Sequence, residues 1–194
     1  AMYEAKSAGR NTQRFFDPRM QAMVNARTHL ESDLRQAIHG GELQVYYQPV
    51  MDGKGVLIGA EALVRWNHPR RGLVMPAEFI SLAEQSGLIV ELGAFVMRTA
   101  CKQLTEWATE SCTAALTVSV NVSPRQFRNK SFVDDVLSIL HDTGANPAKL
   151  KLELTENLLL GDVNETVHRM RDLKDMGVGF SLDDFGVGYS SLSY

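Results

Sequence analysis

The feature that most constrains the fold of this chain is a regular alternation of short strands and helices. The first helix after the opening strands begins at Pro76, and it ends at Gly87. Strands that alternate with helices about 30 residues apart are typical of parallel β/α units. The sequence therefore predicts an α/β fold with strands over 43–50, 56–66, 117–122, 150–155 and 178–183, and helices over 76–87, 88–109, 131–143 and 163–176.

The predicted parallel strands each have one apolar and one polar face. In strand 117–122, Val118 and Val120 share one face, whereas Ser119 and Asn121 share the other. Parallel strands buried on both sides are usually apolar throughout, and barrel interiors are usually filled by Val, Ile and Leu. One such strand is typical of an exposed edge. Four in succession indicate a shared polar interior, in which carboxylates need cations.

The stretch from Gly59 to Trp66 places a carboxylate and a guanidinium on one strand face. Glu61, Leu63 and Arg65 share that face and alternate with small apolar residues. Taken alone, the stretch is more typical of an ordinary surface strand with its polar residues in solvent. The polar faces of the other strands favour a partner or a metal ion instead, because burying unpaired charges is costly.

Oxygen-bearing side chains recur on successive strands. Their position toward the C-terminal part of each strand is where β/α barrels place their active sites. With no Cys or His among them, the donors favour Mg²⁺ or Mn²⁺ over zinc. The adjacent Asp183 and Asp184 can reach two ions about 3.5–4 Å apart, as in two-metal phosphoester hydrolysis. The candidate ligands are Glu61, Asn121, Glu153 and Asp183, with Asp184 in the following loop.

The composition excludes several classes of function. A net charge of −3 and a pI near 6.0 argue against a nucleic-acid polymer as partner. Cys101 and Cys112 have no metal-ligand spacing and form no disulfide framework, which indicates a cytoplasmic setting. We expect no direct membrane contact from this segment, although a longer parent protein could be membrane-tethered. The tripeptide from Asp184 to Gly186 also occurs in protein kinases, but the kinase phosphate and catalytic loops are missing.

The first 16 residues are too few to bury a core of their own. They contain the pattern Tyr3, Ala5, Lys6, Gly9, Arg10 and Asn11. With this pattern they resemble the closing segment of GGDEF (diguanylate cyclase) domains, which predicts that 1–16 is the C-terminal remnant of such a domain. The alternative is a disordered leader. Residues 17–41 are predicted to form a connecting helix packed on the next domain, which spans 42–194.

Five motifs occur in order along residues 42–194: Tyr47-Gln48-Pro49, Glu61-Ala62-Leu63-Val64-Arg65-Trp66, Asn121-Val122-Ser123, Glu153-Leu154-Thr155-Glu156 and Asp183-Asp184-Phe185-Gly186. Together they resemble the EAL domain, the bacterial cyclic di-GMP phosphodiesterase family. The GGDEF-like segment agrees with this resemblance, since the two domains often occur in tandem.

The EAL resemblance implies a modified TIM-type β/α barrel whose first strand, 43–50, runs antiparallel. In the family, metal-activated water attacks a phosphorus and opens cyclic di-GMP to linear pGpG, and a homodimer forms through this domain. Glu156 matches the residue that holds the loop after Asp184 in place. The implied ligands of two Mg²⁺ or Mn²⁺ ions are Glu61, Asn121, Glu153, Asp183 and Asp184, and the implied contacts to cyclic di-GMP are Gln48, Leu63 and Arg65.

Two departures from the family pattern matter. Val187 stands where the family usually has Thr or Ala, in the loop that links the site to dimerisation. The chain also ends at Tyr194, after about five of the eight strands of a complete barrel, before the family's catalytic Lys and a later Glu. We expect the parent protein to be a phosphodiesterase and the isolated piece to be inactive or nearly so. The alternatives are a non-catalytic cyclic di-GMP receptor, and a structural fragment that mediates dimerisation or domain exchange.

Overall fold

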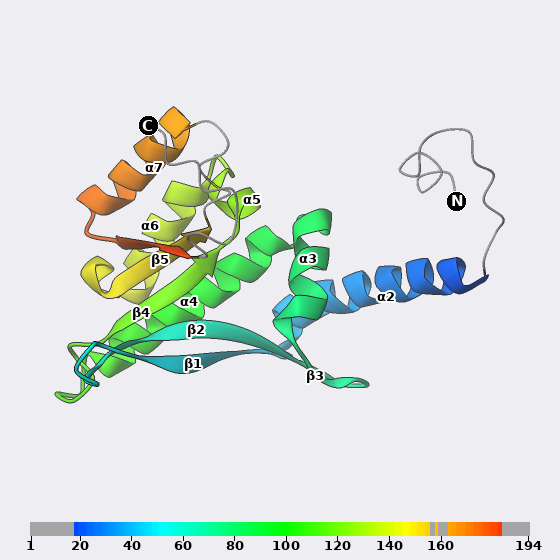
Figure 1. The fold of residues 1–194 in the computed structure, drawn as a ribbon, viewed down its shortest axis with the longest axis horizontal. Helices are drawn as coiled ribbons and strands as arrows, with labels where there is room; N and C mark the ends of the chain where they lie inside the picture. The colour runs from blue at the N-terminus through cyan, green and yellow to red at the C-terminus, as the bar shows by residue number, and fades with distance from the viewer. Residues whose placement is uncertain (1–17, 156–157, 159–162, 184–194) are drawn as a thin grey trace.

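The computed structural model describes residues 18–155, 158 and 163–183, with only the backbone at 18–20 and at Asp183. Figure 1 shows the order of the elements along the chain. They are α2 (Pro18–Gly40), β1 (Leu43–Met51), β2 (Leu57–His68), β3 (Gly72–Val74), α3 (Pro76–Ser86), α4 (Ile89–Trp107), β4 (Thr117–Val122), α5 (Pro124–Phe127), α6 (Phe132–Thr143), a 3₁₀ turn (Pro147–Lys149), β5 (Leu150–Thr155), α7 (Val163–Asp175) and β6 (Gly179–Asp183).

The strands form one sheet in the order β1-β2-β4-β5-β6, with β3 paired to β2 outside this path. β1 is antiparallel to β2, whereas β2, β4, β5 and β6 are parallel to one another. This confirms the predicted α/β fold with an antiparallel first strand. Within the described residues the sheet is open, and β1 and β6 are its edges.

The seam between β2 and β4 is short. Their parallel pairing joins Gly59–Ala62 to Thr117–Val120, and β2 then continues to His68 as the partner of β1 and β3. As a result, Glu61 lies in the N-terminal half of β2. The prediction that each ligand lies toward the C-terminal part of its strand is therefore wrong for Glu61, because the hairpin pairing extends β2 well beyond its parallel segment.

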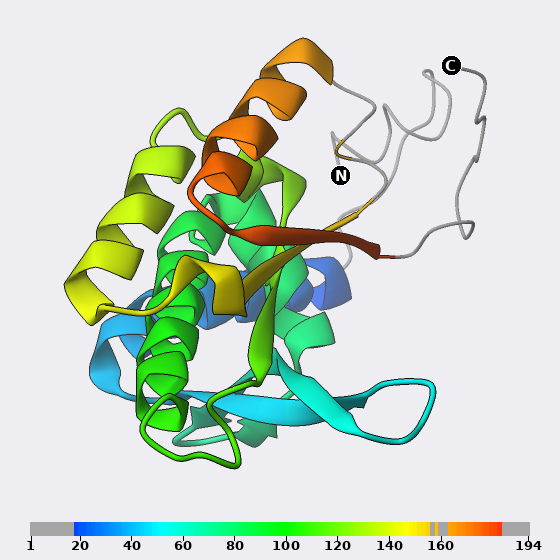
Figure 2. The same cartoon turned by 90° about the vertical axis from the view of Figure 1, so that its left-hand side faces the viewer.

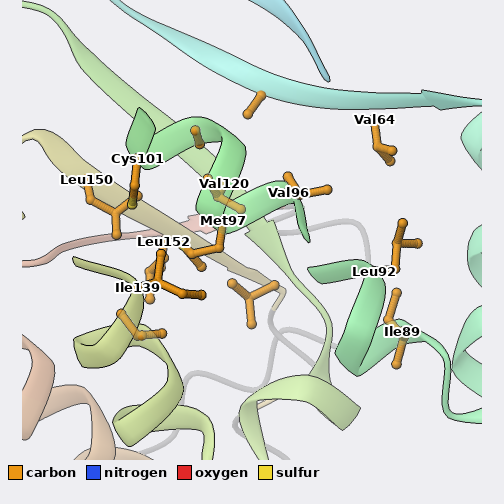
Figure 3. Close-up of a cluster of buried hydrophobic side chains, with 14 of the residues drawn as sticks. Val64, Ile89, Leu92, Val96, Met97, Cys101, Val120, Ile139, Leu150 and Leu152 are labelled. Atoms are coloured by element: carbon orange, nitrogen blue, oxygen red, sulfur yellow. The ribbon is translucent and has the colours of Figure 1, made fainter. Parts of the chain in front are cut away.

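One face of the sheet, here called the outer face, is covered by helices. Figure 2 shows α4, α6 and α7 side by side on this face. The close-up in Figure 3 places Met97 of α4 among Val120, Leu152 and Ile139, and all four side chains are buried. The predicted apolar faces of β4 and β5 are confirmed. On the edge strand β6 the prediction fails at Leu182, whose side chain is 44% exposed.

The N-terminal helix α2 packs over only part of its length. Leu34, Ala37 and Ile38 belong to the buried core, whereas Met23 and Val24 are 73% and 57% exposed. Figure 1 shows the first turns of α2 extending away from the rest of the protein. The prediction that the helix of residues 17–41 packs on the next domain is therefore confirmed for its C-terminal half and wrong for its N-terminal half. The predicted boundaries at 16 and 41 stay predictions, and residues 1–16 lie outside the described part.

The helix boundaries follow from local backbone chemistry. Pro76 occupies the first turn of α3, and Gly87 ends that helix with a φ of 89° that a side chain would disfavour. Gly144 ends α6 in the same way, with a φ of 69°. Among the described residues, no helix combines the length and the apolar character that crossing a lipid bilayer requires.

Candidate functional site

The face of the sheet opposite the outer face, here called the inner face, brings three predicted site residues together. Gln48 of β1 lies opposite Glu61 of β2, and Glu61 is aligned with Ser119 of β4. Asn121 follows two residues later on the same face of β4. Its Nδ2 donates a hydrogen bond of 2.6 Å to Oε1 of Glu61. Residues 60 positions apart in sequence thus meet across the β2–β4 seam.

The inner face continues onto the next two strands. Asn121 is aligned with Glu153 of β5, and Glu153 with Ser181 of β6. The Ser181 hydroxyl donates to Oε1 of Glu153 at 3.4 Å. Glu61, Asn121 and Glu153 therefore occupy one face of three neighbouring strands, as the alternation predicted.

The remaining acidic candidates are less completely described. The backbone of Asp183 is aligned with Thr155, two residues beyond Ser181 along β6. The side chain of Asp183, together with Glu156 and Asp184, lies outside the described residues. Their roles stay predictions.

The donors on the inner face fit a hard divalent cation. Glu61, Asn121 and Glu153 offer carboxylate and amide oxygens, the ligand type that Mg²⁺ and Mn²⁺ take. The hydrogen bond between Asn121 and Glu61 uses the amide nitrogen and one carboxylate oxygen, so it does not use the Asn121 amide oxygen or the second Glu61 oxygen. Across 18–155, 158 and 163–183, no cluster of three or more His, Cys, Asp or Glu side chains is close enough to bind a metal. The side chains of Asp183 and Asp184, the other predicted carboxylate ligands, lie outside the described part.

Arg65 shares the inner face of β2 with Glu61, four residues further along the strand, and it contacts the first strand. Its guanidinium carbon lies 5.8 Å from the centre of the Tyr46 ring, diagonally across the β1–β2 hairpin. Its Nη1 donates to the Val64 carbonyl at 2.9 Å. That bond uses one of the five guanidinium N–H donors, and the planar group suits an anion such as phosphate.

A cavity of about 320 Å³ adjoins the inner face where β2 leaves β4. The strands line it with residues of both faces, among them Leu63 and Asn121 of the inner face and Val64 of the outer face. Mostly apolar side chains of α3 and α4, including Ile80 and Leu92, and the segment 123–126 line the rest. A mainly apolar cavity that Asn121 and Leu63 of the inner face also line can hold the base of a nucleotide. No sequence pattern indicated this cavity, because it depends on where the β2–β4 pairing ends.

The titratable side chains whose pKa values are raised most lie away from the inner face. Burial raises the pKa of the Cys101 thiol to about 11 and that of the Tyr47 hydroxyl to about 12. The Cys101 thiol is therefore protonated at neutral pH and is a poor nucleophile. The oxygen donors of the inner face, and not this buried thiol, are therefore the candidates for chemistry.

Sequence comparison assigns the chain to a known family. The sequence model described as "EAL domain" matches residues 31–194. The chain belongs to the EAL domain family. The match begins inside α2, before the boundary at residue 42 that the strand pattern suggested.

Two curated EAL relatives come from Pseudomonas aeruginosa. The bifunctional diguanylate cyclase/cyclic di-GMP phosphodiesterase MucR is 43% identical over 195 residues, which cover 100% of this chain and 28% of MucR. The cyclic di-GMP phosphodiesterase NbdA is 37% identical over 100% of this chain and 25% of NbdA. The chain thus spans about a quarter of the length of these relatives.

Solved EAL structures have the same fold. The MucR phosphodiesterase in complex with cyclic di-GMP superimposes with a TM-score of 0.79 at 42% identity, covering 84% of this chain and 66% of that one. The EAL enzyme Bd1971, bound to cAMP and cyclic di-GMP, also gives 0.79, at 28% identity, covering 89% and 48%. The open sheet of this chain therefore corresponds to part of an EAL barrel.

Several groups around the site were not singled out from the sequence. The Tyr46 ring lies against the Arg65 guanidinium, and the Ser181 hydroxyl donates a hydrogen bond to Glu153. The short helix α5 was missed altogether. Its start is nevertheless visible in the sequence, because Ser123 and Gln126 have the Ser-x-x-Gln spacing of a helix capping box.

Proposed function

We propose that the full-length protein is a metal-dependent phosphodiesterase that hydrolyses cyclic di-GMP to linear pGpG. The observation that carries this proposal is the convergence of Glu61, Asn121 and Glu153 on the inner face of three neighbouring strands. Membership of the EAL family supports it, as do relatives named for this activity. The neighbouring guanidinium and cavity suit the phosphate and base of a nucleotide.

Two Mg²⁺ or Mn²⁺ ions are the proposed cofactors. Bound ions of this kind lower the pKa of water and stabilise charge on the attacking and leaving oxygens of a phosphoester. Their proposed ligands are Glu61, Asn121, Glu153, Asp183 and Asp184. The hydrogen bond from Asn121 supports this set, because it orients the Glu61 carboxylate across the seam.

The dinucleotide is proposed to lie against β1, β2 and the adjoining cavity. Arg65 would bind a phosphate oxygen, with Tyr46 restricting the guanidinium. Gln48 lies opposite Glu61 and can donate an amide hydrogen bond to the ligand. Leu63 lines the cavity, so its proposed contact is with a base. Glu156 is proposed to position the loop that follows Asp184.

The wider organisation of the protein is also a proposal. Residues 1–16 are proposed to end a GGDEF-like segment, which the alignment of the whole chain with the bifunctional relative MucR supports. An EAL-mediated homodimer and a cytoplasmic location of the domain complete the proposal. Light scattering of the full-length protein tests the dimer, and a monomeric mass would contradict it.

The decisive experiment measures turnover in the full-length protein. Purified protein is incubated with cyclic di-GMP and Mn²⁺ or Mg²⁺, and pGpG is quantified by chromatography, alongside the variant Asn121→Ala and a sample treated with a chelator. We expect metal-dependent pGpG formation that the variant and the chelator abolish. Tight binding of cyclic di-GMP without metal-dependent turnover would contradict the enzyme and indicate a receptor.

A further inference from the structure

The end of β4 that carries Asn121 has a neighbouring strand on only one side. The β2–β4 pairing stops at Ala62 and Val120, whereas the β4–β5 pairing continues through Asn121 and Val122. Backbone hydrogen bonds from β5 alone therefore hold this strand end within the sheet. The position of Asn121 must depend on the segment that comes directly after β4 in the chain.

A single helical turn, α5, succeeds β4 immediately and is closed by a reciprocal cap. The Ser123 hydroxyl accepts a hydrogen bond from the Gln126 backbone N–H at 3.2 Å. In return, the Ser123 backbone N–H donates to Oε1 of Gln126 at 3.4 Å. Ser123 is two residues from Asn121, so the capping box fixes the chain direction directly after the strand.

The Gln126 side chain also joins this turn to α4. Gln126 is only 5% exposed, and its amide lies against Gly93 of α4. A Cβ placed on Gly93 would overlap Nε2 and Cδ of Gln126. Gly93 is therefore needed for close approach, because any larger residue would displace the Gln126 amide from its place in the cap.

Two arginines join the same turn to further helices. Arg125 Nη1 donates to the Gln85 carbonyl at 3.2 Å and to the Glu84 carbonyl, at the end of α3. Arg169 of α7 donates to the Asn129 carbonyl at 2.9 Å and to the Phe127 carbonyl. The turn is thus fixed to three helices, while it leads directly from the strand that carries Asn121.

We propose that Gln126 is a positioning residue for the metal site, and that Gly93 provides the space in which the Gln126 amide packs against α4. Gln126 packs against α4 and is bonded to Ser123 through the capping box, so it fixes the backbone at the end of β4. The fixed backbone holds the Asn121 amide toward Glu61. This inference rests on the proposed function, because it requires Asn121 to be a metal ligand. Neither Gln126 nor Gly93 contacts the metal in this proposal; both act through the backbone at 121–123.

The test measures Mn²⁺ affinity in the full-length protein by isothermal titration calorimetry. Gln126→Met keeps the side-chain volume but loses the acceptor for Ser123, and Gly93→Ala displaces the amide without altering it. We expect each change to weaken Mn²⁺ binding about tenfold to a hundredfold, the range seen when groups that orient metal ligands are removed. Ser123→Ala should weaken binding in the same direction, whereas Ser123→Thr keeps the hydroxyl and should restore it.

Controls separate positioning from a general loss of stability. Ile38→Val trims the core on α2, far along the chain from α5, and should leave Mn²⁺ affinity unchanged even though it lowers the melting temperature. Titrations are run well below each melting temperature, and the Ser123 pair serves if Gly93→Ala does not fold. Wild-type-like affinity in Gln126→Met and Ser123→Ala, with Asn121→Ala still impaired, would overturn the inference alone. Mn²⁺ binding that is unchanged in Asn121→Ala would remove Asn121 from the ligand set and overturn the inference, whereas the proposed function fails only if the wild type shows no metal-dependent turnover.

Discussion

The two faces of β4 and β5 carry opposite chemistry on the same backbone. The outer face buries Val118, Val120 and Leu152 against α4 and α6. The inner face, one residue out of phase, presents Asn121 and Glu153 among other polar side chains. Because strand side chains alternate with a period of 2, adjacent residues serve stability and chemistry separately. Substitutions at neighbouring positions should therefore have separable effects.

The largest expected effect is on the outer face. Leu152→Ala removes a fully buried side chain and should lower the free energy of unfolding by about 2–5 kcal/mol. Urea denaturation monitored by circular dichroism measures the change. The folded fraction should bind Mn²⁺ as the wild type does. Weakened Mn²⁺ binding without loss of stability would show that the faces are not separate.

The matching change on the inner face is at the next residue. Glu153→Gln removes a carboxylate charge and keeps the shape, so Mn²⁺ affinity should fall by at least about a hundredfold. The metal-free unfolding free energy should change by no more than about 0.5 kcal/mol, because the side chain is outside the core. Calorimetric titration and urea denaturation measure the two quantities. A destabilised protein with intact metal binding would reverse the assignment of the faces.

A smaller effect is expected at Arg65. Arg65→Lys keeps the positive charge but loses the planar guanidinium. That group stacks on Tyr46 and can form a bidentate contact with phosphate. The affinity for cyclic di-GMP should fall about tenfold, while Mn²⁺ affinity stays unchanged. Arg98→Lys, at a surface ion pair with Asp142, is the matched control and should have no effect on either affinity. Equal losses from both variants would point to charge alone.

The smallest expected effect concerns a polar cluster at the margin of the outer face, where α2 meets β2. Asp33 bonds the ring of buried His68 at 3.1 Å and Arg70 at 2.9 Å. Desolvation raises the pKa of the Asp33 carboxyl, but the bonds from His68 and Arg70 outweigh it and hold that pKa below 3.8.

A lowered pKa contributes stability above the unfolded value and loses it as pH falls through the folded value. Asp33→Asn should therefore be slightly less stable than the wild type at neutral pH. The difference should shrink as the pH drops below about 4, measured by urea denaturation across pH. A stability difference that grows in acid would contradict an origin in the ionised Asp33 carboxylate. A change in Mn²⁺ affinity would show that the outer and inner faces are not independent.

The sequence predicted the elements whose pattern is local. Strands 117–122 and 150–155 agree with β4 and β5 at both ends, because alternating Val or Leu with polar residues specifies a strand without distant partners. The three-residue β3 and the four-residue α5 were missed, since elements this short depend on tertiary pairing and on capping. Which residues of these strands lie on the inner face was predicted for the same reason, because side chains alternate between the two faces of a strand.

The geometry of the site was less predictable. Three features follow from where β2 separates from β4: the position of Glu61 along β2, the hydrogen bond from Asn121 to Glu61, and the cavity beside Leu63. Pairing registers of this kind join residues far apart in sequence, and side-chain periodicity does not encode them. The assignments of Asp184 and Glu156 remain predictions from the family resemblance.

The central claim is that the inner-face oxygens form a divalent metal site, and anomalous diffraction from Mn²⁺-soaked crystals of the protein tests it most directly. The account predicts anomalous density on the inner face, within coordination distance of the Glu61 and Glu153 carboxylates and the Asn121 amide oxygen. Density bound elsewhere on the protein, with these three side chains uncoordinated, would contradict it.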